Sequence, residues 1–326
     1  MDRGLVVGVD AGATSTRCVV ATLDGAVVGR GVAGGANLNS SGGDVAGELA
    51  AALRAALSTV DPARVRAGVV GGAGSAGAAR EAFRSAAGRA WAAAGPAGEV
   101  RTVTDLEVAF TAGTPQPGGV LLLSGTGALA ARFAGGALER RCDGYGWLLG
   151  DEGSAVWMGL RAMRAAVAAV DGRGEPTVLL EAALRWAGAD RAAGDDLAQA
   201  LVAAGFARPP AELGGLAPAV SEAADAGDAV ALRICAAAAA KLLHTFDVVG
   251  PPAGDVVLAG SVLLSPGPVA RAVHEGVARR TGAEPREAAD GAAGAAALAL
   301  ARLTGTVPAA VHARLTGHEP GRRRSG

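Results

Sequence analysis

Short apolar runs that lead into loops of small and hydroxyl-bearing residues recur three times along the chain. The first run starts at Leu5, and a loop at 11–16 separates it from a second apolar run at 18–21. The same design starts again at Val120, around a Ser-Gly-Thr-Gly turn, and a related segment starts at Val256. Apolar runs on either side of a glycine-containing loop predict a strand, a turn and a second strand.

Elsewhere the spacing of apolar residues predicts mostly helices. Between residues 43 and 60, apolar side chains recur at Ala46, Leu49, Leu53 and Leu57, which is typical of one helix face. By the same reasoning, helices are predicted at 43–60, 76–94, 154–170, 176–187, 194–204, 217–226, 228–248, 269–280 and 291–303, and further strands at 26–31, 65–71, 100–103 and 256–259. This order of strands and helices indicates an α/β protein with a mixed sheet.

A chain of 326 residues is long enough for two domains. The proline- and glycine-rich segment 114–119 is the clearest linker, and the strand–turn–strand pattern restarts after it. We therefore place the start of a second domain at about residue 118. Residues 306–315 show no pattern that indicates which part of the protein they pack against.

Composition and charge exclude several classes of function. A formal net charge of −1 provides no basic surface for nucleic acid, and the arginines at 322–324 lie in a polar tail. Cys18, Cys142 and Cys235 are scattered and form no CxxC pair, so neither a disulfide framework nor a metal–sulfur site is indicated. No uninterrupted apolar run approaches 18 residues with strong hydropathy, and the alanine-rich segment 291–301 is too short to span a bilayer. We expect a soluble cytoplasmic protein without nucleic-acid or membrane partners.

The first loop could bind a phosphate group. Its residues have little side-chain bulk, so a ligand can approach the backbone N–H groups closely. Asp10 stands before this loop, beside hydroxyl groups, in an arrangement that suits a magnesium-bound nucleotide. An ordinary hairpin would account for the loop alone, but its repetition at Val120 favours a nucleotide held between two similar halves. Because Lys241 is the only lysine, a Gly-x4-Gly-Lys phosphate loop is absent.

Asp105 follows a predicted strand in the segment TVTDLEVAF. Strand ends in open α/β sheets are where ligands bind, and a carboxylate there could accept a proton from a substrate hydroxyl. Alternatively, Asp105 could cap the N-terminus of the helix that follows it. These two roles are compatible.

The segment 142–154, CDGYGWLLGDEGS, is the most distinctive in the chain. It combines closely spaced glycines with Tyr145, Trp147 and an acidic pair, Asp151 and Glu152, at the start of a predicted helix. Carboxylates in the first turn would favour the helix dipole, but this does not explain the glycines and aromatics. A loop that folds over a polyhydroxylated ligand explains both.

Taken together, these segments resemble the N-acetylglucosamine kinase branch of the BadF/BadG/BcrA/BcrD ATPase family, within the actin/hexokinase/Hsp70 superfamily. The matching segments occur in the family's order: VGVDAGATSTR, GGANLNSSG, VTDLEVAF, LLLSGTGALA, DGYGWLLGDEGSAVWMG and VVLAGSVLLS. They extend from Leu5 to Ser265, and the closing segment DGAAGAAALALARL also fits.

The resemblance implies two actin-like (ribonuclease H-like) ATPase domains with an interdomain cleft. The first would comprise residues 1–117, with a C-terminal helix at about 290–315 packing back on it. The second would comprise 118–289 with a helical insertion, and 316–326 would be a disordered tail. The resemblance also implies ATP and Mg²⁺ as cofactors, an amino-sugar substrate and a homodimer.

Roles carry over at the matching positions. Asp105 matches the general base, and Asp10 resembles the acidic residue that holds Mg²⁺ through water. The predicted sugar-binding residues are Asn37, Asp105, Gly144, Tyr145, Gly146, Asp151 and Glu152. The predicted nucleotide-binding residues are Gly12, Thr14, Ser15 and Thr16 in the first loop, Gly125, Thr126 and Gly127 in the second, and Gly214, Gly260, Ser261 and Ser265 around the adenosine.

Some positions depart from the family pattern. Ala11 and Ala13 stand where the first loop usually has more glycine, Ala128 replaces a serine, and Tyr145 stands where tryptophan is usual. The implied activity is ATP-dependent phosphorylation of N-acetylglucosamine at O6. The alternatives are glucosamine or N-acetylmuramic acid as substrate, an activator ATPase, which would need a cysteine-held iron–sulfur cluster, and a non-catalytic sugar sensor.

Overall fold

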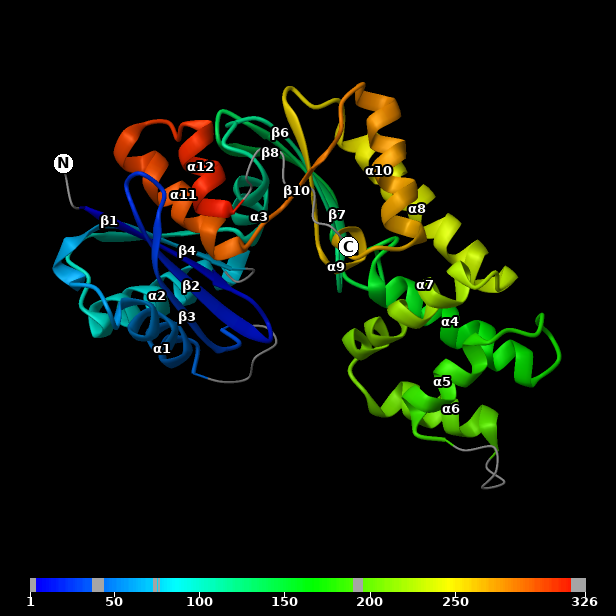
Figure 1. Ribbon diagram of the computed structural model, residues 1–326. Helices are drawn as coiled ribbons and strands as arrows, with labels where there is room; N and C mark the ends of the chain where they lie inside the picture. Colours follow the sequence, from blue (N-terminus) through cyan, green and yellow to red (C-terminus); the bar gives the residue numbers. More distant parts are fainter. Residues whose placement is uncertain (1–3, 37–43, 73–74, 76, 190–195, 318–326) are drawn as a thin grey trace. The chain divides into compact units, whose positions relative to one another are not determined.

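The computed structural model describes residues 4–36, 44–72, 75, 77–189 and 196–317. The chain divides into two compact units (Figure 1). Unit 1 comprises Met1–Pro117 and Glu287–Gly326, and unit 2 comprises Gly118–Arg286. Each unit contains a five-stranded sheet.

Unit 1 is built on a mixed sheet with strand order β3-β2-β1-β4-β5. Its strands are β1 (Leu5–Ala11), β2 (Ser15–Thr22), β3 (Val27–Gly34), β4 (Val65–Gly72) and β5 (Glu99–Val103). The first three strands form an antiparallel meander, whereas β4 and β5 continue the sheet in parallel with β1. The central strand β1 is buried, which explains its nearly continuous apolar sequence.

Helices cover both faces of this sheet. They are α1 (Val45–Leu57), α2 (Arg80–Ala94), α3 (Asp105–Gly113), α11 (Gly291–Thr304) and α12 (Ala309–Thr316), with short 3-10 turns at Pro62–Arg64 and Gly77–Ala79. Successive strand side chains point to opposite faces. Leu5 and Val7 therefore pack with α1 and α2, and Val6 packs with α11. A Cβ on Gly8 would lie 2.1 Å from the Ala296 backbone nitrogen, so glycine permits the close approach of α11.

Unit 2 repeats the same plan, with strand order β10-β9-β6-β7-β8. Its strands are β6 (Gly119–Ser124), β7 (Ala128–Ala134), β8 (Ala137–Asp143), β9 (Asp255–Ala259) and β10 (Arg286–Glu287). Its helices are α4 (Ala155–Val170), α5 (Leu179–Ala187), α6 (Leu197–Ala207), α7 (Ala217–Asp225), α8 (Ala229–Val249), α9 (Ser261–Leu264) and α10 (Pro268–Thr281), with a 3-10 segment at Pro210–Leu216. β6 pairs antiparallel with β7 and parallel with β9, as β1 does with β2 and β4.

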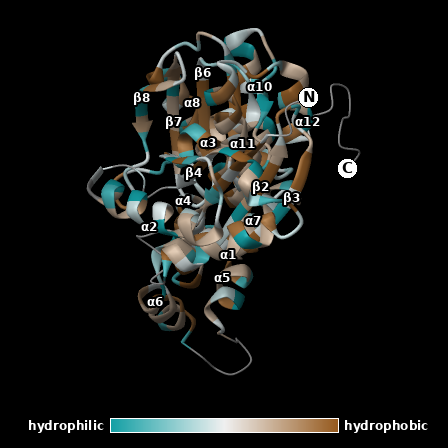
Figure 2. Cartoon of the chain, turned by 90° about the vertical axis from the view of Figure 1, so that its left-hand side faces the viewer, coloured by the Kyte–Doolittle hydropathy of each residue, from teal (hydrophilic) through white to brown (hydrophobic). Residues whose placement is uncertain are grey.

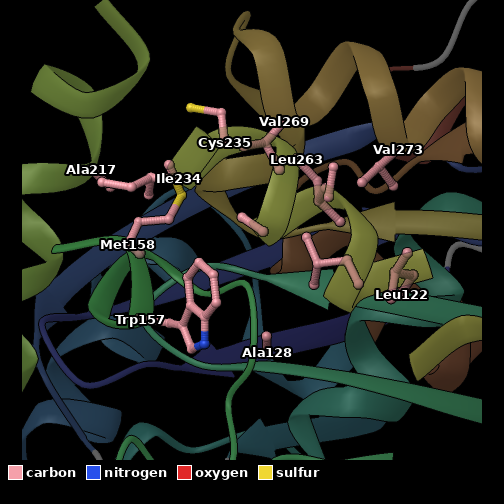
Figure 3. Packing of buried hydrophobic residues seen from close by; sticks show 14 of the residues in the cluster. Leu122, Ala128, Trp157, Met158, Ala217, Ile234, Cys235, Leu263, Val269 and Val273 are labelled. Atoms are coloured by element: carbon pink, nitrogen blue, oxygen red, sulfur yellow. The ribbon is translucent and has the colours of Figure 1, made fainter. Parts of the chain in front are cut away.

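The core of unit 2 joins this sheet to α4, α8 and α10. Leu122 and Ala128 from the strands pack in one cluster with Trp157, Met158 and Ile234 from the helices (Figure 3). A second cluster joins α4 to α5 and α6. Coloured by hydropathy, the helices carry teal and brown residues together (Figure 2). This agrees with amphipathic helices that bury one face.

The α/β class and the two similar halves are confirmed by these sheets. Four helices or strands were missed. β8 is an exposed strand without apolar alternation, β10 has two residues, α9 is a four-residue helix directly after β9, and α12 occupies part of the unassigned segment 306–315. The predicted tail at 316–326 overlaps the end of α12 at Thr316, and residues 318–326 lie outside the described residues.

Among the described residues, α8 alone is long and apolar enough to span a membrane, although Arg233, Lys241 and Asp247 interrupt its apolar runs. This helix has 21 residues, and its most apolar window has a mean hydropathy of 1.4, so length and composition alone would allow it to cross a membrane. However, 44% of that window is buried inside the structure. Ile234, Cys235 and Leu242 belong to the core of unit 2. The apolar character of α8 is therefore that of a core helix.

Candidate functional site

In unit 1, two of the predicted site carboxylates lie at one edge of the sheet. β1, β4 and β5 run parallel, so their carboxyl ends meet at the same edge. The strand register aligns Asp10 with Gly71, and Gly71 with Val103. Asp105 follows Val103 by two residues, and its charge raises the pKa of Asp10. The two carboxylates are therefore electrostatic neighbours.

The capping interpretation of Asp105 was wrong in its position. Thr104 is the N-cap of α3, and its hydroxyl accepts a hydrogen bond from the Glu107 N–H. The Glu107 carboxylate accepts one in return from the Thr104 N–H, at 2.7 Å, which completes a capping box. Asp105 is instead the first residue of α3, half-buried, and its Oδ1 accepts from the Leu106 N–H at 3.1 Å.

Asp10 lies in an environment that disfavours its charge. Burial, followed by the charges of Asp105 and Asp290, raises its pKa from 3.8 to about 6, and Arg17 opposes this shift. The N-terminus of α11 is close enough that a Cβ on Gly291 would lie 2.2 Å from an Asp10 oxygen. Three carboxylates thus interact around the end of β1, an arrangement that a cation would stabilise.

Asp290 was not predicted as a site residue. It caps α11 through the Ala292 N–H, and it forms an ion pair with Arg30 of β3 at 3.0 Å. The sequence signal was an Asp-Gly pair directly before an apolar helix, which indicates a cap. The proximity of Asp290 to Asp10 depends on the packing of α11 against β1, which no local signal reveals.

The pKa of Asp10 predicts a pH-dependent effect on stability. A carboxyl group whose pKa is raised by folding destabilises the folded state increasingly as pH rises from 3.8 through about 6. In magnesium-free buffer, Asp10→Asn should raise the free energy of unfolding by about 1–3 kcal/mol at pH 8, and by a small part of that near pH 4. Urea unfolding at both pH values checks this.

Glu81→Gln, which removes an exposed carboxylate from α2, is the matched control and should change stability little at either pH. If Asp10→Asn were no more stable than the wild type at pH 8, the carboxylates would not repel one another as described.

The first loop is a closed hairpin turn. The Gly12 N–H donates to the Ser15 carbonyl at 3.0 Å, and Thr14 is exposed at the tip. Thr16 differs from its predicted role, because its hydroxyl is fully buried and donates to the Gly34 carbonyl at 2.8 Å. Thr16 therefore links β2 to β3, and its hydroxyl already has a backbone partner.

In unit 2, the second loop is tied to the start of α4. The Gly125 N–H donates to the Gly127 carbonyl and closes the turn, while Thr126 is exposed. The Gly125 carbonyl accepts from the Ala155 N–H at 2.8 Å, and the buried Ser124 hydroxyl donates to the Gly153 carbonyl at 3.0 Å. The loop and the acidic segment before α4 therefore form one connected structure.

Asp143 organises the glycine-rich segment, although the sequence analysis gave it no role. Its carboxylate accepts hydrogen bonds from the N–H groups of Gly144, Asp151 and Glu152, at 2.7, 2.8 and 2.9 Å. Asp143 and Asp151 have φ values of 66° and 54°, in the left-handed region that non-glycine residues seldom adopt. Strained backbone of this kind is concentrated at functional sites.

Asp151 joins this segment to the second loop. Its Oδ1 accepts from the Ala128 N–H at 3.3 Å, and a Cβ on Gly127 would lie 3.0 Å from its Oδ2. Burial raises the pKa of Asp151, and hydrogen bonds from the Ala128 and Gly146 backbone oppose that shift. A predicted sugar-binding carboxylate and a predicted phosphate-binding loop are therefore in direct contact.

The other residues of the glycine-rich segment are mostly exposed. Tyr145 and Trp147 have exposed fractions of 61% and 45%, and the Arg141 guanidinium lies 5.5 Å from the centre of the Tyr145 ring. Glu152 forms an ion pair with Lys241 at 2.9 Å. The Glu152 carboxylate is thus already paired with a cation, and the prediction that it binds the sugar did not include this ion pair.

Three predicted adenosine-binding residues line one hollow of about 260 Å³ in unit 2. They are Gly214, from the 3-10 segment before α7, and Ser261 and Ser265, at the two ends of α9. Gly260 directly precedes Ser261 in the chain, and it packs against Gly125 of the second loop. The volume is close to the lower end of the range for small-molecule pockets, roughly 300–1,000 Å³.

The wall of this hollow, which we call the α7–α9 hollow, is chemically mixed. Ala155, Met158, Ala217, Pro218, Val262, Pro266, Gly267, Val269 and Ala270 provide apolar surface, and Ser221, Glu222 and Asp225 provide polar groups. Apolar walls suit a purine ring, and a carboxylate such as that of Glu222 can accept hydrogen bonds from ribose hydroxyls. Four of the predicted nucleotide residues of unit 2 thus lie at or beside one hollow.

A family model for BadF/BadG/BcrA/BcrD ATPases matches residues 7–299, most of the chain. The chain belongs to the BadF/BadG/BcrA/BcrD ATPase family. An N-acetylmuramic acid/N-acetylglucosamine kinase from Clostridium acetobutylicum is 30% identical over 175 residues. That match covers 53% of this chain and 57% of the relative, so the chain spans little more than half the length of this curated relative.

Solved structures show the fold of this family member. A Chromobacterium violaceum protein described as an N-acetylglucosamine kinase has a TM-score of 0.70 at 24% identity, covering 92% of this chain and 100% of that chain. A ROK family glucokinase from Streptomyces griseus, in complex with glucose and AMPPNP, has a TM-score of 0.54 at 18% identity, covering 91% and 99%. The predicted actin-like ATPase fold is confirmed.

The carboxylates of unit 1 fit a magnesium ion that is bound mainly through phosphate and water. Among the described residues, no three His, Cys, Asp or Glu side chains lie together closely enough to form a complete metal cage. Mg²⁺ in phosphate-transferring ATPases needs only one or two carboxylates, because water and phosphate oxygens supply the other ligands. Asp10, with its raised pKa of about 6 among other carboxylates, fits that requirement.

Asn37, which was predicted to bind the sugar, lies outside the described residues.

The α7–α9 hollow leads to a prediction for this ATPase family member. Ser221 lies on α7 and lines the hollow. Ser221→Phe should fill it and raise the KM for ATP by about tenfold, because a purine ring would lose part of its space. The KM for the second substrate should change by less than about threefold. Steady-state kinetics with each substrate varied in turn would check this, and an unchanged KM for ATP would place the purine elsewhere.

Proposed function

We propose that this protein transfers the γ-phosphoryl group of ATP to the O6 hydroxyl of N-acetylglucosamine. The observation that carries the proposal is the contact of Asp151 with Gly127 and Ala128, which joins a sugar-type loop to a phosphate-type loop in one unit. Family membership and the names of the Clostridium and Chromobacterium relatives support an amino-sugar kinase.

Asp105 acts as the general base in this proposal. The attacking oxygen forms a bond to the γ-phosphorus, its proton passes to the Asp105 carboxylate, and the bond to the leaving ADP oxygen breaks. Phosphoryl transfer asks the protein mainly for positioning and charge stabilisation. The half-buried position of Asp105, an electrostatic neighbour of the proposed magnesium-binding Asp10, supports this role, because the base must reach the attacking hydroxyl close to the phosphate-binding groups while being shielded from bulk water.

The remaining roles divide by segment. The backbone of Gly144–Gly146 would donate hydrogen bonds to the sugar hydroxyls through its N–H groups and accept them through its carbonyls, and the Asp151 carboxylate would accept them. Thr14 and Thr126, exposed at the tips of the two loops, would bind the nucleotide phosphates. Asp10 would hold Mg²⁺ through water, and the ion would neutralise charge on the phosphates.

Two alternative sugars, glucosamine and N-acetylmuramic acid, need the same machinery and differ only in their substituents. An activator ATPase is less well supported. Such a protein holds an iron–sulfur cluster with cysteines, but Cys18 is buried in the core of unit 1 and Cys235 in the core of unit 2. Burial also raises the pKa values of these thiols, to about 12 and about 11. Thiolate ligands at these positions are disfavoured.

The proposal is tested by measuring ADP release from ATP with N-acetylglucosamine, glucosamine, N-acetylmuramic acid, glucose or no sugar. Release should depend on an amino sugar and be fastest with N-acetylglucosamine. ADP release at the same rate without any sugar would indicate an ATPase, and no release with any sugar would indicate a sensor. The homodimer and the cytoplasmic location stay predictions, which gel filtration and fractionation can check.

A further inference from the structure

A second hollow in unit 2, of about 270 Å³, lies between the glycine-rich segment and one face of α4. We call it the α4 hollow. Its wall is formed by Trp147, Leu148, Leu149, Gly150 and Glu152 from the segment, and by Trp157, Leu160, Arg161 and Arg164 from α4. The wall residues from α4 are not among the predicted site residues.

The α4 hollow has an excess of positive charge. Arg161 and Arg164 are one turn apart, so both guanidinium groups reach the same side of the helix. Among the described residues, neither is within ion-pairing distance of a carboxylate. Glu152, the one carboxylate in the described wall, is instead paired with Lys241 at 2.9 Å. The two arginines therefore line the hollow without a direct ion-pair partner among the described residues, and Glu152 compensates the charge of Arg161 only in part.

Arg161 is held in place rather than extended into solvent. Its guanidinium lies 3.3 Å from the centre of the Trp157 ring, which is itself buried in the core (Figure 3). Burial, followed by the charge of Arg164, lowers the pKa of Arg161, and Glu152 only partly offsets this. A stacked arginine with its donors fixed in one plane is well suited to bind a carboxylate with two hydrogen bonds.

The opposite wall is apolar and exposed. Leu148 and Leu149 have exposed fractions of 74% and 80%, and Trp147 of 45%. Such exposure in consecutive large side chains is typical of a ligand-binding surface. The hollow thus combines an apolar wall with a cationic wall, which matches a small substituent carrying both a methyl or methylene group and a carboxylate.

The occupant follows from the position of the hollow. Gly150 and Glu152 line it, and they flank Asp151 in the same loop that we propose holds the sugar. We propose that Arg161 and Arg164 bind the carboxylate of an acidic substituent on the amino sugar, such as the lactyl ether of N-acetylmuramic acid. This rests on the proposed function and adds a specificity site to it. The substrate class would then include acidic amino sugars.

The test compares kcat/KM for N-acetylmuramic acid with kcat/KM for N-acetylglucosamine in the full-length protein. Arg164→Gln, at an exposed position, should lower the ratio of the first to the second by about 10- to 100-fold, as expected for loss of a charge-assisted hydrogen bond. Arg161→Lys keeps the charge but loses the planar fork, and it should lower the ratio less than Arg161→Gln. Arg185→Gln on α5, outside the hollow, is the matched control and should leave the ratio unchanged.

The possible results separate the two proposals. A wild-type protein that phosphorylates N-acetylglucosamine but not N-acetylmuramic acid, or arginine variants with an unchanged ratio, would overturn the inference and leave the kinase proposal standing. If neither sugar were phosphorylated, both would fail. Inorganic phosphate is added in a separate arm. If it altered the rates for both sugars equally through Arg164, the hollow would bind a free anion and the inference would be overturned.

Discussion

Asp105→Asn is expected to lower kcat by at least about a hundredfold while leaving the affinity for ATP within about threefold of the wild type. The amide has nearly the same shape as the carboxylate, but it cannot accept the proton of the sugar hydroxyl. The charge of Asp105 also repels that of Asp10. Asp105→Asn removes this repulsion, so the expected loss of kcat cannot be caused by added repulsion between the two side chains. Pre-steady-state or steady-state ADP release gives kcat, and titration calorimetry gives the ATP affinity.

Glu107→Gln is the matched control for this substitution. Glu107 lies on the same helix and its side chain completes the capping box with Thr104, a role that glutamine can also fill. We expect kcat to stay within about threefold for this variant. A turnover near that of the wild type in Asp105→Asn would remove Asp105 from the chemical step and leave it as a first-turn residue of α3.

Asp143→Asn has the second largest expected effect, on the sugar. The wild-type carboxylate accepts three backbone hydrogen bonds from the glycine-rich segment, at 2.7–2.9 Å. Asparagine tolerates the left-handed backbone at this position, so the substitution tests the hydrogen bonds rather than the conformation. With one oxygen replaced by an NH₂ group facing N–H donors, the sugar KM should rise by about 10- to 100-fold.

The ATP KM should rise by less than about threefold in the same variant, because the α7–α9 hollow involves neither Asp143 nor its three partners. Glu139→Gln, an exposed position on the same strand, controls for the loss of charge. Equal increases in both KM values would mean that Asp143 maintains the whole of unit 2 and has no particular role in positioning the sugar loop.

Much of the fold could be read from the sequence, because its signals are local and repeated. The hairpin loops follow buried strands in both units, and the helices with strong apolar spacing, such as α1 and α8, were predicted within a few residues. β8 could not be predicted in this way. It lies at the sheet edge with most of its side chains exposed, so it lacks the alternation that a half-buried strand shows.

The candidate site was predictable only where one segment carried the signal. Asp10, Asp105 and Asp151 each belong to a distinctive motif. Asp290 and Asp143 act by approaching other segments through the packing of α11 and the folding of the loop, and neither approach is encoded locally. The Thr104 cap is different. Its Thr-x-x-Glu pattern was present in the sequence and identifies Thr104 over Asp105 as the cap.

Thr16 shows a packing contact that the sequence did not reveal. A hydroxyl close to a glycine-containing loop was taken as a phosphate ligand, yet strand pairing buries it against Gly34. A strand residue two positions past the turn points to one face of the sheet, and the sequence could not tell which face was covered. The α4 hollow was missed for a related reason, since Arg161 appears as an ordinary charged helix residue until it is placed against Trp157.

The most direct test of the central claim is to identify the product. Purified protein with MgATP and N-acetylglucosamine should yield ADP and a single phosphorylated sugar, whose phosphorus couples to the C6 protons in ³¹P–¹H NMR spectra. The same reaction with Asp105→Asn should yield almost none. Formation of inorganic phosphate with the sugar recovered unchanged would contradict the account.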